Sequence, residues 1–491
     1  MKTLDDVLVI GAGVMGIGIA QVAAEAGHRV FLFDAREGAA AQARDTLAAQ
    51  LDQLVAKGRR SRAAADATLG LLTPVAQLRD AACAGLAIEA IVEKLEAKRG
   101  LLAELEGLLG DDAILASNTS SISITKIAAG LRRPERVVGM HFFNPVPLMR
   151  LVEVVRGLQT SDEVVRRVTE MAVAWGKTPV TALSTPGFIV NRIARPYYAE
   201  ALMLLQERAA APEALDACLR AAGFRMGPCE LMDLIGHDTN FSVTTSVFEA
   251  NFFDRRFTPS LVQRELVDGG LLGRKSGRGF YRYPEGAPAP TAAEMSAPDP
   301  AKPVTIHGSD PLAAQFLATL KARGCSVVHR PDSAWTGLEV GGARLVRTDG
   351  RTARELQRTA GAGDVAVFDE VLGPPGALAF ATAGDPAWRQ RAAGWLHLLG
   401  FQPIAVEDAP GLVVARTLAM LVNEAADAVQ QGVCSPAGAD AAMRLGVNYP
   451  QGPFEWLDRM GAARVVALVE SLDNHYRGER YRVSPGLRRQ A

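Results

Sequence analysis

The sequence is poor in cysteine and carries almost no net charge. Only five cysteines occur in 491 residues, and no two of them form a C-x-x-C pair. This scarcity excludes a disulfide framework and a thiolate metal site, and it is typical of a reducing compartment. The formal net charge of −1 excludes bulk nucleic-acid binding, which needs a basic surface. We therefore expect neither a metal ion nor a nucleic acid among the partners.

The sequence also lacks a long apolar run near its start, because Gly11, Gly13 and Gly16 interrupt the first one. This pattern is not typical of a signal peptide or of a membrane span, so we expect a cytoplasmic protein without a membrane partner. The remaining composition is ordinary for a globular protein, with 48% hydrophobic and 22% charged residues. The length indicates two to four domains.

The first 34 residues carry the pattern of a dinucleotide-binding unit. Residues 7–10 (VLVI) predict a buried strand, residues 17–26 a helix, and residues 29–33 a second strand that ends in Asp34. The turn between the first strand and the helix reads Gly11, Ala12, Gly13, Val14, Met15, Gly16. These glycines let the backbone approach a pyrophosphate, and the carboxylate of Asp34 suits ribose hydroxyls but repels a 2′-phosphate. The pattern predicts NAD as cofactor; a tight structural turn is the alternative.

The rest of the chain divides into regions with different predicted secondary structure. Further strands expected at 86–92, 113–116 and 137–143 alternate with helices, which predicts a doubly wound, mostly parallel sheet. Long helical patterns then follow, and a Pro- and Ala-rich linker precedes a second strand–turn–helix–strand plan. The turn of that plan, residues 308–311, lacks the glycine fingerprint and carries Asp310 where a phosphate would lie. We predict an α/β Rossmann-like domain (1–184), an all-α domain (185–283), a linker (284–303), a reduced Rossmann-like domain (304–404) and a second all-α repeat (405–491).

An internal repeat links the two helical regions. PGFIVNR at 186–192 returns as PGLVVAR at 410–416, and MGPCELMDLIG at 226–236 returns as QGPFEWLDRMG at 451–461. The repeat predicts a pseudo-dimeric chain in which the second module packs against the first, although pairing between chains in a homodimer is the alternative. Asn191 corresponds to Ala415. A purely structural asparagine would be present in both copies, so we assign Asn191 to an active site.

Two ionisable residues lie in apolar strands on either side of a proline turn. His141 ends one strand, Asn-Pro-Val-Pro follows, and Glu153 lies within Leu-Val-Glu-Val-Val. A carboxylate in an apolar strand is costly unless it is paired. If the turn places the strands side by side, the carboxylate fixes one imidazole tautomer, and the imidazole can take a proton from an alcohol. With a dinucleotide site, this pair predicts oxidation of a secondary alcohol.

A run of hydroxyl and amide residues follows the strand expected at 113–116. The run, SNTSSISI at 117–124, begins at the carboxyl edge of the predicted sheet, where such folds bind ligands. Helix capping is the structural alternative, but one cap leaves several side chains free. We expect Ser120 to hold the substrate oxygen.

Together these motifs resemble the NAD-dependent (S)-3-hydroxyacyl-CoA dehydrogenases. The resemblance runs in order over about 1–283 and includes AIVEK, SNTSS, HFFNPVP, LVEV, PGFIVNR and GRKSGRGFY. It implies His141 and Glu153 as the catalytic pair, with Ser120 and Asn191 at the substrate. The implied NAD contacts, besides residues 11–16 and Asp34, are Glu93, Lys98, Ser120, Asn144 and Lys275. For the coenzyme A part of an acyl-CoA thioester, it implies Lys57 and Ser120, although a neighbouring serine of the family is Gln50 here.

The full-length plan resembles a long bacterial form of this family. That form is associated with phenylacetate breakdown, where 3-hydroxyadipyl-CoA is oxidised. Two alternatives stay open at this point. One is a 3-hydroxybutyryl-CoA dehydrogenase, and the other is a non-catalytic NAD-binding protein with the same fold.

Overall fold

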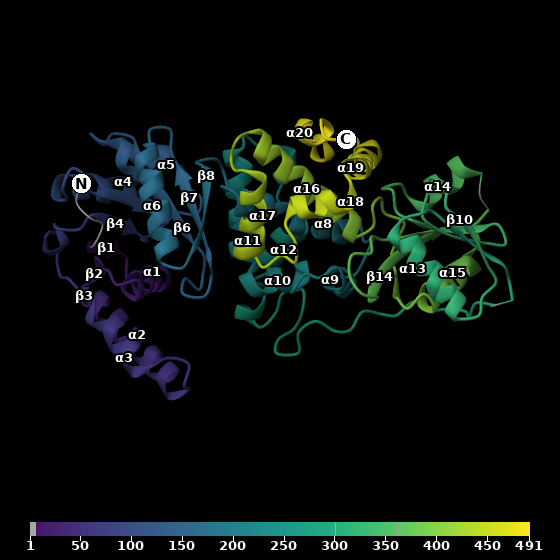
Figure 1. The fold of residues 1–491 in the computed structure, drawn as a ribbon, viewed down its shortest axis with the longest axis horizontal. Helices are drawn as coiled ribbons and strands as arrows, with labels where there is room; N and C mark the ends of the chain where they lie inside the picture. Colours follow the sequence, from purple (N-terminus) through teal and green to yellow (C-terminus); the bar gives the residue numbers. More distant parts are fainter. Residues whose placement is uncertain (1–5, 300, 362) are drawn as a thin grey trace. The chain divides into compact units, whose positions relative to one another are not determined.

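The computed structural model describes residues 6–299, 301–361 and 363–491. It divides into two compact units: the first comprises the chain up to Arg192 together with Gln431–Val447, and the second comprises Ile193–Gln430 and Asn448–Ala491. Figure 1 follows the chain through both units. No helix in the described ranges is long and apolar enough to cross a membrane.

The first unit is built on an eight-stranded sheet with the order β3-β2-β1-β4-β5-β6-β7-β8 (Figure 1). Every neighbouring pair is parallel except β6 and β7, which are antiparallel. The strands are β1 (Asp6–Ile10), β2 (Arg29–Phe33), β3 (Leu72–Pro74), β4 (Leu86–Glu89), β5 (Ile114–Ser117), β6 (Val137–Phe142), β7 (Leu151–Arg156) and β8 (Thr178–Leu183). The predicted doubly wound, mostly parallel sheet is confirmed.

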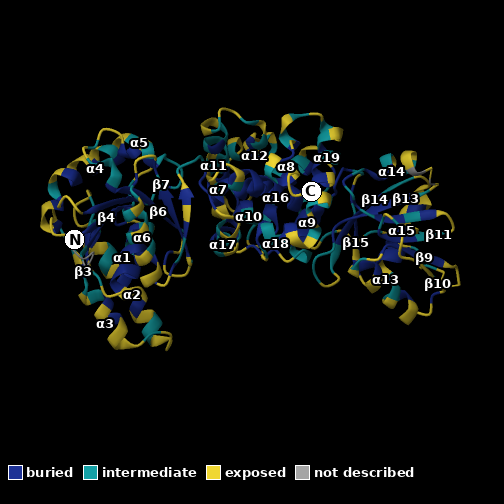
Figure 2. Ribbon diagram, turned by 45° about the horizontal axis from the view of Figure 1, so that its top comes forward, coloured by how far each residue is buried: buried dark blue, intermediate teal, exposed yellow. Residues whose placement is uncertain are grey.

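Helices cover this sheet, and its inner strands β1, β4, β5, β6 and β7 are almost wholly buried, whereas the edge strands β3 and β8 are partly exposed (Figure 2). The helices are α1 (Val14–Glu25), α2 (Ala39–Ala56), α3 (Arg62–Gly70), α4 (Leu95–Leu108), α5 (Ile124–Ala128), α6 (Asp162–Ala174) and α7 (Val190–Ile193), with short 3₁₀ turns η1 (Leu78–Ala81) and η2 (Pro134–Arg136). The long polar helix expected at about 37–58 is α2, and α3 packs against it. Both helices carry exposed outer faces (Figure 2).

The two helical copies have matching elements. The first contains α8 (Arg195–Gln206), α9 (Pro212–Ala221), α10 (Pro228–Ile235), α11 (His237–Ala250), η3 (Arg255–Phe257), α12 (Leu261–Asp268) and η4 (Arg274–Ser276). The second contains α16 (Val414–Gln430), α17 (Pro436–Gly446), α18 (Pro453–Met460), α19 (Ala462–Tyr476), η5 (Glu479–Tyr481) and α20 (Pro485–Arg488). Helix α17 belongs to the first unit, where it packs on β7 and β8.

A smaller mixed sheet forms the reduced Rossmann-like region of the second unit, with the order β10-β9-β11-β12-β13-β14-β15. Its strands are β9 (Val304–His307), β10 (Val327–Arg330), β11 (Gly337–Val340), β12 (Ala343–Arg347), β13 (Val365–Phe368), β14 (Ala377–Ala383) and β15 (Gln402–Ala405); its helices are α13 (Pro311–Ala322), α14 (Ala353–Ala360) and α15 (Pro386–Leu398). Asp310 caps α13 through the amide of Ala313 and pairs with Arg347 at 2.7 Å. A carboxylate therefore occupies the helix start where a phosphate would bind.

Within the second unit, the two helical copies exchange buried charges across their contact. Glu200 on α8 accepts hydrogen bonds from Arg416 (3.0 Å) and Arg480 (3.1 Å) of the second copy. Glu424 on α16, 224 residues after Glu200, accepts one from Arg256 (3.1 Å), which lies 224 residues before Arg480. Such reciprocal contacts are the signature of an approximate two-fold relation. The internal repeat therefore packs on itself through equivalent residues.

Candidate active site

The antiparallel pairing of β6 and β7 places His141 directly opposite Glu153. His141 Nδ1 lies 2.5 Å from Glu153 Oε2. The carboxylate accepts the Nδ1 proton, so the lone pair of the imidazole is at Nε2. The rings of Phe143 and Phe188 lie 4.5 and 5.9 Å from the imidazole centroid. The sequence prediction that the proline turn brings these residues together is confirmed.

The other oxygen of Glu153 holds the start of α7. Oε1 accepts hydrogen bonds from the backbone amides of Ile189 (3.0 Å) and Val190 (2.9 Å), and the carboxylate is fully buried. Phe188 precedes these amides with a φ of 47°, a left-handed conformation that aims them back at β7. Glu153 thus joins the imidazole to the segment that carries Asn191. No sequence pattern predicted this second contact.

Asn191 and Ser120 are also brought together. Asn191 Nδ2 lies 3.4 Å from the backbone oxygen of Ser120, in the loop after β5. In the same loop the Asn118 side chain accepts the amide of Phe142 at 2.9 Å, which ties the loop to the strand that carries His141. Asn118 is a positioning residue that the sequence interpretation missed. The helix cap in this run is Ser123, whose hydroxyl oxygen accepts the backbone amide of Lys126 at the start of α5. Ser120 is therefore not the residue that caps this helix.

Glu93 organises the same loop from the end of β4. Its Oε1 accepts hydrogen bonds from the Thr119 hydroxyl (2.5 Å) and the amides of Ser120 (3.1 Å) and Ser121 (3.2 Å). Burial raises the pKa of Glu93, but Lys98 and these hydroxyls outweigh it, so the pKa lies below its ordinary value. Lys98 is buried and binds Glu93 and Glu89. Glu93 and Lys98 are both predicted NAD contacts, and of these two only Glu93 has an exposed side chain.

The glycine turn after β1 fits a dinucleotide. A Cβ on Gly11 would lie 2.5 Å from the Ala90 oxygen, and one on Gly16 would lie 1.7 Å from the Gly11 oxygen. These two glycines are therefore needed for packing. A Cβ on Gly13 would meet nothing within 4 Å, so the turn has open space there. No acidic side chain lies in the first turn of α1, and its amide groups can stabilise a pyrophosphate.

Asp34 ends β2 beside this turn. Its carboxylate accepts the amide of Ala12 at 2.8 Å and pairs with Arg36 at 3.1 Å. Burial raises the pKa of Asp34, but the Arg36 side chain and the Ala12 amide hold it below its ordinary value. A cavity of about 740 Å³ opens next to it, lined by Ile10, Phe33, Ala35, Ala76, Gln77, Leu78, Arg79, Ile91, Leu101, Glu104, Gly107 and Leu108. Its size and apolar walls suit an adenine ring.

The other predicted contact residues are Asn144, Lys57 and Lys275, and each is described within its own unit. Asn144 is exposed in the turn between β6 and β7, and Lys57 is exposed at the end of α2. Of the basic cluster around Lys57, Arg60 pairs with Glu25, and Arg62 pairs with Asp52 at 2.7 Å. Lys275 belongs to the second unit, where it pairs with Asp238 at 2.5 Å.

A segment of the second copy packs against β7 and β8. The amide of Leu183 on β8 donates to the oxygen of Val433 at 2.9 Å, and Arg192 donates to Gln431 at 2.8 Å. A Cβ on Gly446 of α17 would lie 2.6 Å from Leu151 Cδ2 and 3.1 Å from Val190 Cγ2. The second repeat therefore completes the packing behind Glu153 and the start of α7.

Family models match most of the chain. The NAD-binding domain of 3-hydroxyacyl-CoA dehydrogenase matches residues 6–185, and its C-terminal domain matches both 187–283 and 411–491. A third model, the reduced Rossmann-fold domain of 3-hydroxybutyryl-CoA dehydrogenase, matches 345–410. The chain belongs to the 3-hydroxyacyl-CoA dehydrogenase family.

Relatives of this family match over different lengths. The 3-hydroxyadipyl-CoA dehydrogenase of Escherichia coli K12 is 44% identical over 100% of this chain and 98% of its own. A crystal structure of 3-hydroxybutyryl-CoA dehydrogenase from E. coli K12 is 43% identical, with a TM-score of 0.91 over 100% and 98% of the two chains. The (S)-3-hydroxybutyryl-CoA dehydrogenase structure from Ralstonia eutropha is 40% identical, with a TM-score of 0.55, and covers 57% of this chain and 99% of its own.

The protein is thus a 3-hydroxyacyl-CoA dehydrogenase that uses NAD to oxidise 3-hydroxyacyl-CoA thioesters. The predicted family, fold class, reaction and cofactor are confirmed, and the non-catalytic alternative is wrong. Short relatives such as the R. eutropha enzyme cover only the first half of the chain. The additional half holds the reduced Rossmann-like region and the second helical copy.

Proposed function

We propose that this 3-hydroxyacyl-CoA dehydrogenase acts on (S)-3-hydroxyadipyl-CoA and serves phenylacetate breakdown in the cytoplasm. The observation that carries the proposal is the full-length relative named for this substrate, at 44% identity. The full-length solved structure bears the name of the butyryl substrate, so 3-hydroxybutyryl-CoA is the second candidate. The domain boundaries at 184, 283, 303 and 404, and association into a homodimer, are part of the same proposal.

Within the site, His141 acts as the general base. Nε2 takes the proton of the substrate's 3-hydroxyl group, and Glu153 stabilises the imidazolium through the 2.5 Å contact at Nδ1. NAD, bound at residues 11–16 and Asp34, would accept the hydride from the same carbon. The support for these roles is the buried, oriented pair beside a glycine turn with open space at Gly13.

The loop after β5 positions the substrate. Ser120 and Asn191, whose contact spans 3.4 Å, direct the hydroxyl and thioester oxygens. Glu93, Lys98, Asn144 and Lys275 are further proposed contacts of NAD, and the ion pair between Lys98 and Glu93 at 3.1 Å supports a joint role of these two side chains. Lys57, exposed at the end of α2, binds a phosphate of coenzyme A with the basic residues near it.

The acyl preference is tested by steady-state kinetics. Formation of NADH is followed with the CoA thioesters of 3-hydroxyadipate, 3-hydroxyhexanoate and 3-hydroxybutyrate. We expect the highest kcat/KM with the adipyl substrate, whose terminal carboxylate distinguishes it from the hexanoyl thioester of equal length. A higher kcat/KM with the butyryl thioester would favour the second candidate instead.

The role of His141 is tested separately with His141→Ala. We expect kcat to fall about 10²- to 10⁴-fold, the range for loss of a general base, while the Kd for NAD stays the same. Cofactor affinity is measured by calorimetry. Full activity of this variant would contradict the assigned mechanism, whatever the acyl preference.

A further inference from the structure

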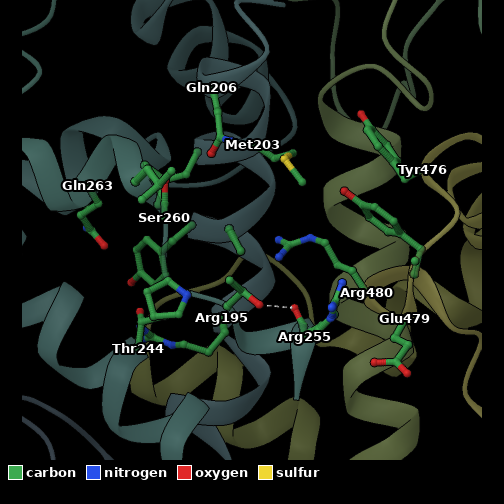
Figure 3. A pocket seen from close by; sticks show the side chains of 18 residues that line it. Arg195, Met203, Gln206, Thr244, Arg255, Ser260, Gln263, Tyr476, Glu479 and Arg480 are labelled. Atoms are coloured by element: carbon green, nitrogen blue, oxygen red, sulfur yellow. Dashed lines mark hydrogen bonds between the residues drawn. The ribbon is translucent and has the colours of Figure 1, made fainter. Parts of the chain in front are cut away.

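The second unit contains a cavity at the contact between its two helical copies. It measures about 380 Å³, within the range of small-molecule sites. Figure 3 shows its lining: Met203, Gln206 and Arg195 come from α8, Ser260 and Gln263 from the α12 segment, and Tyr476, Glu479 and Arg480 from the second copy. No residue proposed for catalysis or cofactor binding lines this cavity.

The equivalent place on the other side of the repeat is closed. There the segment of η5 and α20 packs on α16: Asn423 donates to the oxygen of Arg482 at 2.9 Å and accepts the amide of Ser484 at 2.7 Å. Arg482 also pairs with Asp427 at 2.6 Å. Ser484 and Leu487 are fully buried.

The first copy lacks the side chains that make these contacts. At the spacing of 224 residues, Asn423 corresponds to Ala199 and Asp427 to Met203, while Thr258 stands for Arg482. Two elements of the fold persist in both copies: η3 matches η5, and Ser260 caps its helix as Ser484 does. The cavity therefore lies where the first copy lacks side chains that the second copy uses to join the same elements.

The polar side of the cavity is rich in arginine. Arg195, Arg255 and Arg480 line it, against a single carboxylate, Glu479. Arg480 binds Glu200 through one terminal nitrogen, while its buried Nε has no hydrogen-bond partner within the described residues. Arg255 is exposed, and its side chain forms no ion pair with residues 6–299, 301–361 or 363–491. These charges favour a ligand with a carboxylate, which guanidinium groups bind well.

The remaining wall is apolar. Leu202 and Met203 of α8 face the cavity, and Leu261 at its edge has 68% of its surface exposed. An alkyl or aromatic group placed here would bury that surface, with each buried CH₂ group contributing about 0.8 kcal/mol in the general case. A ligand with one anionic end and one apolar end matches both walls.

We propose that this cavity is a second small-molecule site, which binds an organic carboxylate with a short apolar tail. The carboxylate contacts Arg255 and Arg480, and the tail lies against Leu202, Met203 and Leu261. The site needs both helical copies, since Arg480 comes from the second copy and the apolar wall from the first.

The test is calorimetric titration of the full-length protein with hexanoate, in the presence of NAD and a 3-oxoacyl-CoA product to fill the catalytic site. We expect one hexanoate per chain. Arg255→Gln should weaken binding about tenfold, the usual effect of losing one strong contact, and Met203→Trp should abolish binding by filling the cavity. Arg389→Gln is the matched control, because Arg389 is exposed on α15 and lines no part of the cavity.

Two further measurements are a titration with hexylammonium and a crystal structure after soaking with hexanoate. The cation should not bind, and electron density for hexanoate should lie between Met203 and Arg255. Equal binding of hexylammonium, no binding of hexanoate, or unchanged affinity in Arg255→Gln would each overturn the proposal. Arg255→Gln changes an exposed side chain, so the test does not depend on the folding of Met203→Trp. None of these measurements uses catalytic activity, so they stand apart from the substrate assignment.

Discussion

Glu153 uses its two carboxylate oxygens for two different purposes, one directed at His141 and one at the start of α7. The second copy keeps only the latter purpose. Asp369, which follows β13, accepts the amides of Val413, Val414 and Ala415 at 2.7–2.9 Å. Val413 and Val414 are the repeat equivalents of Ile189 and Val190. A carboxylate that holds a helix start is therefore present in both copies, as Glu153 in the first and Asp369 in the second.

The two purposes of Glu153 predict different results for two substitutions. In Glu153→Gln the amide oxygen can still accept from α7, so the fold is kept while the imidazolium loses its counter-charge. We expect lower kcat and a changed pH–rate profile with normal thermal unfolding. In Glu153→Ala the amides of Ile189 and Val190 lose their partner, and unfolding should become easier by about 1–3 kcal/mol. Equal unfolding of the two variants would contradict the anchoring role.

We expect Asp34 to determine the choice between the two nicotinamide cofactors. Its carboxylate is held charged by Arg36 and the Ala12 amide, and a 2′-phosphate beside it would be repelled. We expect a clear preference for NAD that does not change between neutral pH and about pH 5, because the pKa of Asp34 lies below its ordinary value and the carboxylate stays ionised throughout this range.

Substituting Asp34 tests the same point directly. In Asp34→Ser, Arg36 is released and can bind a 2′-phosphate, so the ratio of kcat/KM for NADP to that for NAD should rise. Arg389→Gln, which changes an exposed side chain of α15 in the second unit, serves as the control. Better use of NADP by the unmodified protein would contradict the cofactor assignment.

At the level of single residues, the sequence predicted the contact between His141 and Glu153, because strand spacing and the proline turn determine which side chains meet across β6 and β7. It could not predict the partners of Glu89, Asn118 or the second oxygen of Glu153. Those contacts depend on where loops and helix starts turn their amide groups, and local sequence does not fix that direction.

Among the elements, α17 has the least expected position. The repeat assigns it to the second helical copy, yet it packs on β7 and β8 in the first unit. The sequence indicated that a helix was present but not its neighbour, because an apolar helix face fits any apolar surface of similar shape. The glycine that ends α17 marks the contact, since it lies against Leu151 and Val190.

This packing makes Gly446→Val a test of the contribution of α17. The added side chain must displace Leu151 or Val190, which flank Glu153 and Asn191. We expect kcat to fall severalfold and stability to fall by about 1–3 kcal/mol, as for overpacked interiors. Ala437→Val, at an exposed position of the same helix, should leave both unchanged. An unchanged kcat in Gly446→Val would show that α17 has no influence on the site.

Across the whole chain, the two helical copies meet through buried ion pairs. Glu200 is fully buried between Arg416 and Arg480. Removing one member of such a group leaves uncompensated buried charge. We expect Glu200→Ala to lower the free energy of unfolding by about 3–5 kcal/mol, measured in denaturant. Glu163→Ala, which removes an exposed ion pair with Arg166, should change the free energy of unfolding far less, because solvent screens exposed ion pairs.

The sequence predicted this larger organisation well, because the repeated motifs at 186 and 410 show that one helical module occurs twice. It gave no indication of the cavity beside Arg255, since a void depends on which side chains are absent as much as on those present. Likewise, the reciprocal use of Glu200 and Glu424 is visible only when the partners on the opposite copy are known.

The reciprocal ion pairs have a consequence for how the protein behaves on dilution. When equivalent surfaces lie on separate polypeptides, their association follows mass action, and the complex dissociates as its concentration falls below the dissociation constant. Here the surfaces that carry Glu200 and Arg416 belong to one polypeptide. The effective concentration of one surface near the other is therefore set by the residues that connect them and not by the amount of protein. The contact between the copies should therefore persist in a cell that makes very few molecules of the enzyme.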